Sequence, residues 1–81
     1  MPREFNFHDS LHVLQRSAER NIDTALVYET VKTGAVTHTG MKGRLGGLKV
    51  LYKKRHDRRL IVVVAEVRGS ECYLLTAYEG S

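Results

Sequence analysis

The sequence predicts an α+β domain in which two N-terminal helices pack on an antiparallel sheet of three to four strands. Up to Gly34 the apolar residues recur at helical spacing, and beyond it they follow the shorter period of strands. The strand-like segments are separated by connections of hairpin length, which favour antiparallel pairing. With 81 residues, 42% of them hydrophobic and 27% charged, the chain is expected to form a single domain over residues 1–81.

The first half predicts two short helices joined by a tight turn. Ser10 or Asp9 can cap a helix that ends near residue 20, and Asn21 suits the left-handed conformation that closes it. Asp23 can cap the second helix, and Gly34 stands where a terminating glycine is common. The helices are therefore expected to lie next to each other.

The second half predicts strands separated by turns. A short β-prone run at 35–39 precedes a glycine-rich loop at 40–47. The segment 60–65 is apolar on both faces, which favours a central strand that is covered on each side. Three strands rich in Val, Leu and Tyr are expected at 48–53, 60–67 and 72–78.

Positive charge is concentrated in the second half of the chain. Residues 41–81 carry nine basic and four acidic groups, a balance of +5, whereas residues 1–40 have a balance of −1. Such a patch attracts polyanions and predicts contact with nucleic acid, although it also suits a solvated hairpin whose cations prevent edge pairing. The candidate RNA-binding residues of this block are Lys42, Arg44, Lys49, Lys53, Lys54, Arg55, Arg58 and Arg59.

The first predicted helix carries a candidate catalytic stripe. His12, Arg16 and Arg20 are spaced four residues apart, so their side chains line one side of the helix. An imidazole can transfer protons near neutral pH, and guanidinium groups bind phosphate. The stripe therefore suits phosphodiester chemistry, the alternative being an ordinary solvated helix face.

The last predicted strand offers two hydroxyl groups. Strict alternation places Thr76 and Tyr78 on one face, together with Leu74 and Cys72. Both hydroxyls can hydrogen-bond to a phosphate or a base, and the tyrosine ring can stack on a base. Both residue types are also simply favoured in strands.

Several function classes are not expected. His8 and His12 have a spacing that suits a metal, but a third ligand at a recognisable spacing is missing, so no metal is predicted. The longest apolar run, 60–65, is too short to cross a membrane, and residues 1–4 do not resemble a secretory signal. A cytoplasmic protein without an organic cofactor is expected, and the sequence leaves its oligomeric state open.

The stretch 12–23 resembles the opening motif of a small bacterial family, domain of unknown function 4258. In this motif a histidine is followed by arginines at four and eight positions, and then by Asn-Ile-Asp in this chain. The resemblance continues through Gly34, the valine-rich strand at 62–64, and the closing pair Thr76 and Tyr78. It covers nearly the whole chain.

Families similar to this one are grouped with compact α+β ribonuclease toxins of the RelE and BrnT kind, in a superfamily that includes barnase and EndoU. The resemblance implies a RelE/barnase-like fold, metal-independent cleavage of RNA and a dedicated antitoxin or immunity partner. Carried over by position, it points to His12, Arg16 and Thr76, with Arg20 and Tyr78 as further candidates.

The resulting hypothesis is a toxin-type endoribonuclease that is held inactive by an acidic partner. His12 would act as general base or acid, Arg16 would hold the scissile phosphate, and Thr76 or Tyr78 would orient it. The basic block would bind the flanking RNA backbone. The alternative is a non-catalytic RNA- or ribosome-binding module, or an inactive interaction partner.

Overall fold

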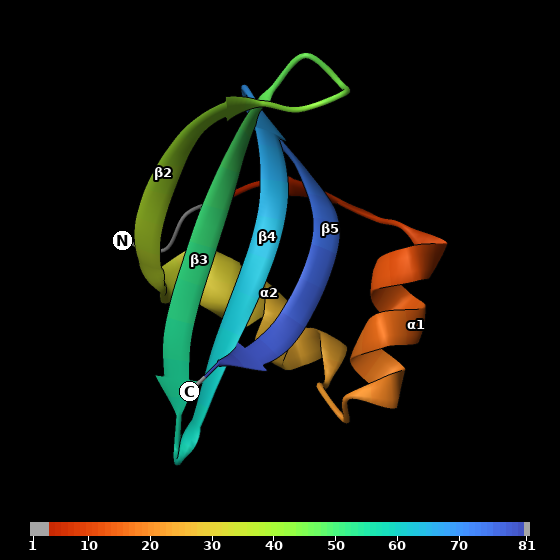
Figure 1. Ribbon diagram of the computed structural model, residues 1–81, viewed down its shortest axis with the longest axis vertical. Coiled ribbons are helices and arrows are strands. Elements are labelled where there is room, and N and C mark those ends of the chain that lie inside the picture. Colours follow the sequence, from red (N-terminus) through yellow and green to blue (C-terminus); the bar gives the residue numbers. More distant parts are fainter. Residues whose placement is uncertain (1–3, 81) are drawn as a thin grey trace.

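The chain folds into two short helices and five strands (Figure 1). A computed structural model describes residues 4–80, apart from the side chains of Leu11 and His12. The helices are α1 (Leu11–Glu19) and α2 (Thr24–Thr33), and the strands are β1 (Asn6–Asp9), β2 (Ala35–Lys42), β3 (Leu48–His56), β4 (Arg59–Arg68) and β5 (Glu71–Gly80).

The five strands form one mixed sheet in the order β1-β5-β4-β3-β2. Strands β2 to β5 run antiparallel, as expected, but β1 pairs in parallel with β5, with Phe7 opposite Cys72. The predicted fold class, with two helices on an antiparallel sheet of three to four strands, is therefore wrong. The expectation failed because β1 has only four residues, and its partner lies at the other end of the chain.

The helix boundaries follow from local capping. The hydroxyl of Ser10 accepts a hydrogen bond from the N–H of Val13, and the carboxylate of Asp23 accepts one from Ala25. Between the helices, Asn21 adopts a left-handed φ of 56°, which Asn tolerates better than most residues. These contacts join the helices through the short turn that the sequence predicts.

Gly34 ends α2 for a reason other than the expected one. Its φ is −77°, so the position does not require a left-handed residue. A Cβ atom at Gly34 would lie 2.4 Å from the carbonyl oxygen of Thr30 and 2.6 Å from that of Lys53. The glycine is needed because the end of α2 and strand β3 approach each other closely.

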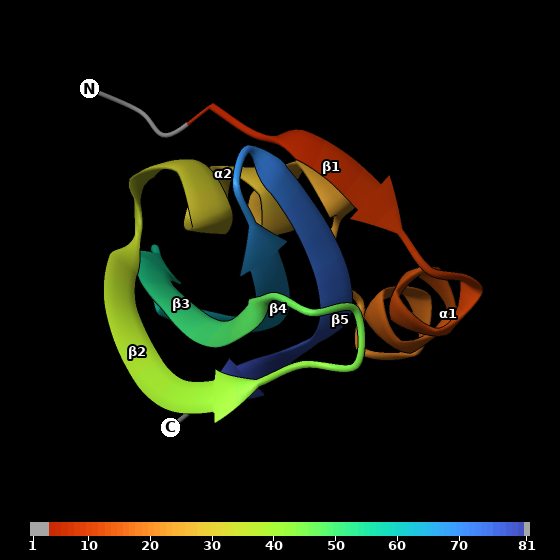
Figure 2. The same ribbon diagram turned by 90° about the horizontal axis from the view of Figure 1, so that it is seen from above.

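Figure 2 shows α2 inside the curve of the sheet and α1 at the edge of the sheet, beside β5. Helix α2 packs on β3 and β4, and α1 packs beside β5. Between α2 and the sheet lies the apolar core, in which Val31, Ile61 and Val63 are fully buried. Tyr28 of α2 also contacts Phe7, with ring centroids 4.7 Å apart, so β1 is joined to the same core.

The other side of the sheet carries no helix, and we call it the open face. Pairing and alternation place on it every second residue of the three central strands. These residues are Lys49, Leu51, Lys53 and Arg55 of β3, Leu60, Val62, Val64 and Glu66 of β4, and Tyr73, Thr76 and Tyr78 of β5.

A β-bulge in β5 changes the predicted face of two residues. Val64 pairs with Thr76, whereas the next residue of β4, Ala65, pairs with Leu74, so Leu75 is the extra residue. Thr76 and Tyr78 therefore lie on the open face, while Leu74 is buried in the core. The predicted shared face of these hydroxyls with Leu74 and Cys72 is wrong because strict alternation fails at the bulge.

Candidate functional site

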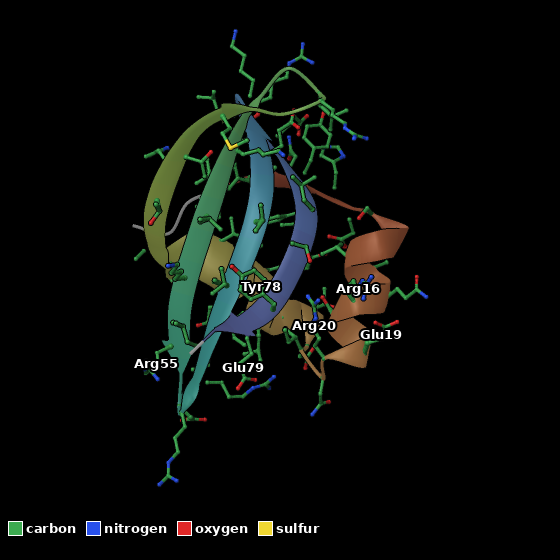
Figure 3. All side chains as sticks on the ribbon, in the orientation of Figure 1. Arg16, Glu19, Arg20, Arg55, Tyr78 and Glu79 are labelled. Atoms are coloured by element: carbon green, nitrogen blue, oxygen red, sulfur yellow. The ribbon has the colours of Figure 1, made fainter. Side chains whose placement is uncertain are left out.

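Helix α1 lies beside β5 and presents Arg16, with Arg20 at its C-terminal end, from the predicted stripe (Figure 3). Arg20 donates a hydrogen bond of 2.7 Å from Nη1 to the carbonyl oxygen of Ala77, which lies between Thr76 and Tyr78. This contact attaches the end of α1 to the part of β5 that extends beyond its pairing with β1. The side chain of His12 lies outside the part of the chain that the structure describes.

Arg16 is exposed on α1 and pairs with Glu19. Its Nη1 lies 3.5 Å from the Glu19 carboxylate, and roughly half of each side chain is accessible to solvent, 47% and 54%. An exposed pair of this kind is weak, so a phosphate can displace the glutamate at little cost. Arg16 therefore remains available to a ligand, while Arg20 is held by the backbone of β5.

The two predicted hydroxyl residues are neighbours on the open face. Thr76 lies opposite Val64 and Tyr78 lies opposite Val62, in adjacent rows of the sheet. Tyr78 is 37% exposed, so its ring is accessible above the strands. The structure thus brings the end of the helix stripe and the two hydroxyls to the same strand.

The predicted basic block divides between the two faces. Lys49, Lys53 and Arg55 alternate along β3 on the open face, and Lys53 and Arg55 are exposed. Lys42 and Arg44 are exposed at the loop that leads into β3, and Arg58 is exposed at the turn between β3 and β4. These six cations are accessible to a polyanion.

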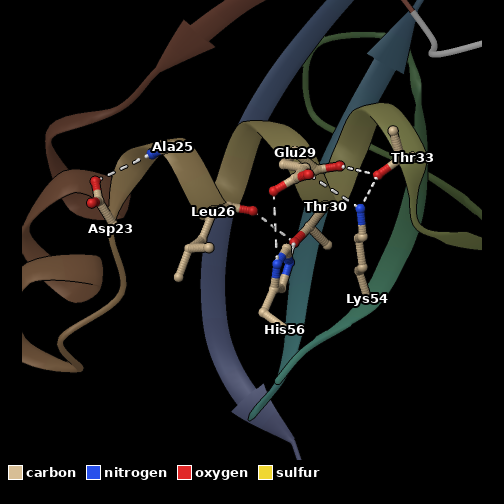
Figure 4. A network of polar contacts seen from close by, with 8 residues as sticks. All are labelled: Asp23, Ala25, Leu26, Glu29, Thr30, Thr33, Lys54 and His56. Carbon is tan, nitrogen blue, oxygen red and sulfur yellow. Dashed lines mark hydrogen bonds and ion pairs between the residues drawn. The ribbon is translucent and has the colours of Figure 1, made fainter. Parts of the chain in front are cut away.

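Two members of the block have partners within the chain. The ammonium of Lys54 donates to the Glu29 carboxylate at 3.3 Å and to the Thr33 hydroxyl at 2.6 Å, both on α2 (Figure 4). Arg59 donates from Nε to the Glu79 carboxylate at 2.8 Å. Binding of RNA by Lys54 or Arg59 would compete with these contacts.

Glu66 is a buried carboxylate that the sequence analysis did not single out. It is 1% exposed, yet it lies on the open face of β4. Its Oε2 atom accepts hydrogen bonds from the backbone N–H groups of Leu45 and Gly47, at 2.8 and 2.9 Å. A Cβ atom on Gly43 would overlap Oε1 of Glu66, so only glycine allows the loop to lie this close.

A cavity of about 440 Å³ lies beside this carboxylate. Its walls combine two apolar side chains, two cations and the buried acid. They are Leu45, Leu75, Arg44, Lys49 and Glu66. A larger cavity of about 510 Å³ lies elsewhere, between β1 and the end of α2, where Phe5, Phe7 and Lys32 are among its lining residues.

A row of polar side chains crosses four strands at the level of Glu66. Cross-strand pairing places His8 of β1 beside Tyr73, Tyr73 beside Glu66, and Glu66 beside Lys49. The His8 ring stacks on Tyr73 with centroids 4.5 Å apart, and its Nε2 lies 3.1 Å from the Glu71 carboxylate. These residues come from distant parts of the sequence, so no local sequence motif indicates that they lie together.

On the helix side, Asp9 influences two neighbouring groups. The Tyr28 hydroxyl donates a hydrogen bond to the Asp9 carboxylate, and this bond raises the tyrosine pKa to about 12. Burial, with a further contribution from Asp9, raises the pKa of the Cys72 thiol to about 12. Cys72 is therefore a neutral core side chain at ordinary pH.

Two further observations concern the described part of the chain only. Its helices are too short to form a membrane-spanning segment. Its His, Cys, Asp and Glu side chains form no group of three or more that is arranged to hold a metal ion.

A comparison with protein-family models gives a match to this chain. The family model described as Domain of unknown function (DUF4258) matches residues 10–79, which include both helices and strands β2 to β4. Neither a curated protein nor a solved structure gives a significant match. Because the match extends over most of the sequence, the chain belongs to the DUF4258 family.

Proposed function

We propose that this protein is a toxin-type endoribonuclease that binds single-stranded RNA across its open face. The observation that carries the proposal is the hydrogen bond from Arg20 to Ala77, because it joins the helix stripe to the strand of Thr76 and Tyr78. Lys53 and Arg55 extend the same face with exposed positive charge. The resemblance of the α1 motif to ribonuclease toxins of the RelE and BrnT kind supports this reading.

The proposed reaction needs only groups of the chain and of the RNA. The 2′-oxygen attacks the adjacent phosphorus, forming a cyclic phosphate, and the bond from phosphorus to the 5′-oxygen breaks. His12 takes the proton of the attacking hydroxyl and returns one to the leaving oxygen. Arg16 binds the phosphate and stabilises its developing charge, and Thr76 or Tyr78 orients it by hydrogen bonding.

The cations of the open face bind the backbone on either side of the cleaved bond. Lys53 and Arg55 lie in successive rows along β3, about 7 Å apart, and Lys49 lies two rows from Lys53, about 14 Å away. The shorter spacing is close to that of successive phosphates in an extended strand, so each cation meets its own phosphate. The Tyr78 ring supplies a surface on which a base stacks.

The positive charges of this face also determine what kind of protein could inhibit it. A partner that places Asp and Glu side chains over Arg16 and the β3 cations excludes RNA from the open face. Complementary charge speeds its association and makes the rate fall with ionic strength. In a competition experiment, the partner and a non-cleavable RNA analogue should exclude each other, whereas simultaneous binding would contradict a shared site.

One observation favours the alternative of a non-catalytic RNA-binding module. Arg16 already has a carboxylate partner in Glu19, as expected for an ordinary solvated helix face. In this alternative the open face binds RNA or a ribosome through the β3 cations alone. Binding of RNA is common to both functions, so only turnover separates them.

Cleavage of a labelled single-stranded RNA in the presence of a chelator tests the proposal. His12→Ala should lower the rate about a hundredfold or more, because general acid–base catalysis contributes at least that much. Tyr78→Phe and Thr76→Val remove each hydroxyl while keeping the side-chain shape. Gln15→Ala, on the exposed surface of the same helix, serves as the control and should cleave like the original protein.

The products add a second check, since the proposed chemistry leaves a cyclic phosphate and a free 5′-hydroxyl. If purified protein binds RNA but leaves it intact, the non-catalytic alternative holds. If His12→Ala cleaves as fast as Gln15→Ala, the assignment of the general base is wrong.

A further inference from the structure

The outer strand β2 is the strongest feature outside the site described above. It stands last in the strand order β1-β5-β4-β3-β2, and Figure 2 shows it at the rim of the curved sheet. Within residues 4–80 it pairs with β3 only, so its other side meets no strand. All of its eight residues are exposed except Val36, which is half-buried. Strand β2 therefore presents a free edge.

Two contacts show which residues of β3 direct their backbone groups toward β2. The carbonyl oxygen of Lys49 accepts a hydrogen bond of 2.8 Å from the Thr39 hydroxyl of β2. The carbonyl oxygen of Lys53 lies so close to Gly34 that a Cβ atom there would be 2.6 Å away. In an antiparallel pair, alternate residues direct both their N–H and C=O groups to the same neighbouring strand. Residues 51 and 53 of β3 therefore exchange hydrogen bonds with β2.

The same alternation assigns the backbone groups of β2. Ala35 and Thr37 stand opposite residues 53 and 51, so their N–H and C=O groups are bonded to β3. Val36 and His38 alternate with them, and their N–H and C=O groups point away from β3 to the free edge. Two donors and two acceptors thus stand in a row that no other strand of the described chain meets. An extended peptide offers groups with the matching spacing.

Residues 35–38 lack the features that usually prevent the addition of a strand. Natural sheets protect a free edge with proline, charged side chains or a bulge. The run Ala-Val-Thr-His contains neither proline nor a Lys, Arg, Asp or Glu residue. The pairing of β2 with β3 does become irregular, but only between His38 and Lys42, beyond this run. The segment 35–38 is therefore suited to pairing with another strand.

Charge selects the kind of strand that can bind there. Between Glu29 and Asp57 the sequence contains seven Lys or Arg residues and no acidic residue, and both β2 and β3 lie within this interval. On the open face, a side chain of an added strand would lie beside Ala35, with Lys53 in the next strand. The added strand and β3 would be about 10 Å apart, a distance that a Glu and a Lys side chain span together across the small alanine. An acidic strand is therefore attracted to this edge.

The same features disfavour two other occupants. A second copy of the chain that paired through β2 would bring two cationic hairpins together, and their like charges would repel each other. The phosphates of RNA only accept hydrogen bonds, so they would leave the outward carbonyl groups of Val36 and His38 without donors. An acidic peptide segment has both the required charge and the required backbone.

We propose that the segment 35–38 of β2 binds an extended acidic segment of a partner protein, which adds a sixth strand to the sheet. Backbone hydrogen bonds with Val36 and His38 hold the added strand, and its carboxylates on the open face pair with Lys53. This inference goes beyond the proposed function, because it does not require that the protein cleaves RNA.

Hydrogen exchange in the protein without a partner gives the first test. The amide of Thr37 is bonded to β3, whereas those of Val36 and His38 point to solvent. The latter two should therefore exchange at least about tenfold faster than that of Thr37. Protection of Val36 and His38 as strong as that of Thr37 would mean that the edge is already covered, and it would overturn the proposal.

A synthetic octapeptide of alternating Val and Glu is the probe for binding to the full chain. It should bind at least about tenfold more tightly than the peptide with Lys in place of Glu, as measured by fluorescence anisotropy, because the Lys peptide is repelled. A Glu peptide that is N-methylated at every peptide bond keeps the charges but loses its backbone donors. It should also bind at least about tenfold more weakly. In NMR spectra, the unmethylated Glu peptide should shift and protect the amides of Val36 and His38.

His38→Pro tests the edge from the side of the protein. Proline removes the outward N–H group without removing a hydrogen bond to β3, which is why it is tolerated in edge strands. Affinity for the Val-Glu peptide should fall at least about tenfold. His38→Ala is the matched control, because it removes the imidazole but keeps the N–H group, and it should bind the peptide like the original protein.

Three results with the original protein would overturn the edge site. They are equal affinity for the Glu and Lys peptides, equal affinity for the N-methylated peptide, and binding that leaves the Val36 and His38 amides unshifted. None of them needs a variant, so they decide the matter even if His38→Pro does not fold. RNA cleavage without binding of the Glu peptide would refute this inference alone, whereas peptide binding by a protein that leaves RNA intact would refute the endoribonuclease proposal alone.

Discussion

The two faces of the same sheet differ in what their side chains do. On the helix side of β4, Ile61, Val63 and Ala65 are completely buried under α2 and contribute to stability. On the open face of the same strand the burial is uneven, because Val62 and Glu66 are buried whereas Val64 is only half-buried. Alternate residues of one strand therefore serve two purposes, and the half-buried positions of the open face can change with less effect on folding than those of the core.

The largest expected difference concerns two isomeric side chains at adjacent positions of β4. Ile61→Ala should lower the free energy of unfolding by about 2–5 kcal/mol, because it opens a cavity in the core. Leu60→Ala removes the same number of carbon atoms from the half-buried open face, and the loss should stay near 1 kcal/mol. Urea unfolding of both variants measures the contrast. Equal losses would show that the open face is as well packed as the core.

The stability of the protein at alkaline pH tests the burial of Cys72 in the core on the helix side of the sheet. The thiol ionises at about its ordinary pKa of 9.0 in the unfolded chain and at about 12 in the folded protein. Stability from the neutral thiol is therefore fully present below pH 9 and is lost as the pH rises toward 12, by about 1.4 kcal/mol per pH unit.

Cys72→Ala should remove this contribution, so the stability of the variant should decrease less steeply above pH 9 than that of the original protein. The thiol should also react slowly with alkylating reagents under native conditions. Rapid alkylation at pH 8 would mean that Cys72 is accessible, in conflict with its burial in the core.

The two arginines of α1 should differ in their contribution to stability, because only Arg20 is bonded to β5. Arg20→Ala should cost about 1.5 kcal/mol of stability, since it removes a charged hydrogen bond to the Ala77 carbonyl. Arg16→Ala breaks only an exposed pair with Glu19 and should cost less than about 0.5 kcal/mol. Thermal unfolding followed by circular dichroism gives both values. A large loss at Arg16 would make it a structural residue and would rule out its proposed phosphate role.

The smallest expected effect is a change in the salt dependence of RNA binding. It compares the cations of the open face with those of the opposite face. Replacing Lys53 and Arg55 by Ser should reduce the slope of log K against log salt by about 0.7–0.9 for each lost phosphate contact. Replacing Lys54 and Arg59, which already have carboxylate partners, removes the same charge and should change the slope less. An equal change in both double variants would show that RNA does not prefer the open face.

Local signals in the sequence predicted the helices well. Ser10, Asp23 and Asn21 act within a few residues of their own positions, so their capping and turn preferences are readable without tertiary structure. The strands β3, β4 and β5 were also expected; β3 begins where it was predicted, and the other ends extend one to three residues further. Gly34 was placed correctly, although the reason for the glycine, its approach to Lys53, was not visible in the sequence.

Features that depend on distant parts of the chain were not predicted. Strand β1 is too short and polar to stand out, and it exists because β5 offers it a partner. The bulge at Leu75 leaves no periodic signal, so the faces of Cys72 and Leu74 were assigned wrongly. Glu66 was overlooked because an acidic residue in a strand usually faces solvent. The glycine-rich loop that contacts it ends 19 residues earlier in the sequence, so no local pattern links the two.

The parallel pairing of β1 with β5 also constrains when the fold can be completed. Phe7 lies opposite Cys72, so the first strand waits for a partner that a ribosome makes 65 residues later (72 − 7). At synthesis rates of about 5–20 residues per second, this delay lasts several seconds. During that time strands β2, β3 and β4 can pair with one another, but Phe7 cannot take its final position against Tyr28. The nascent protein therefore exposes an unpaired first strand to chaperones and proteases until the synthesis of β5 is complete.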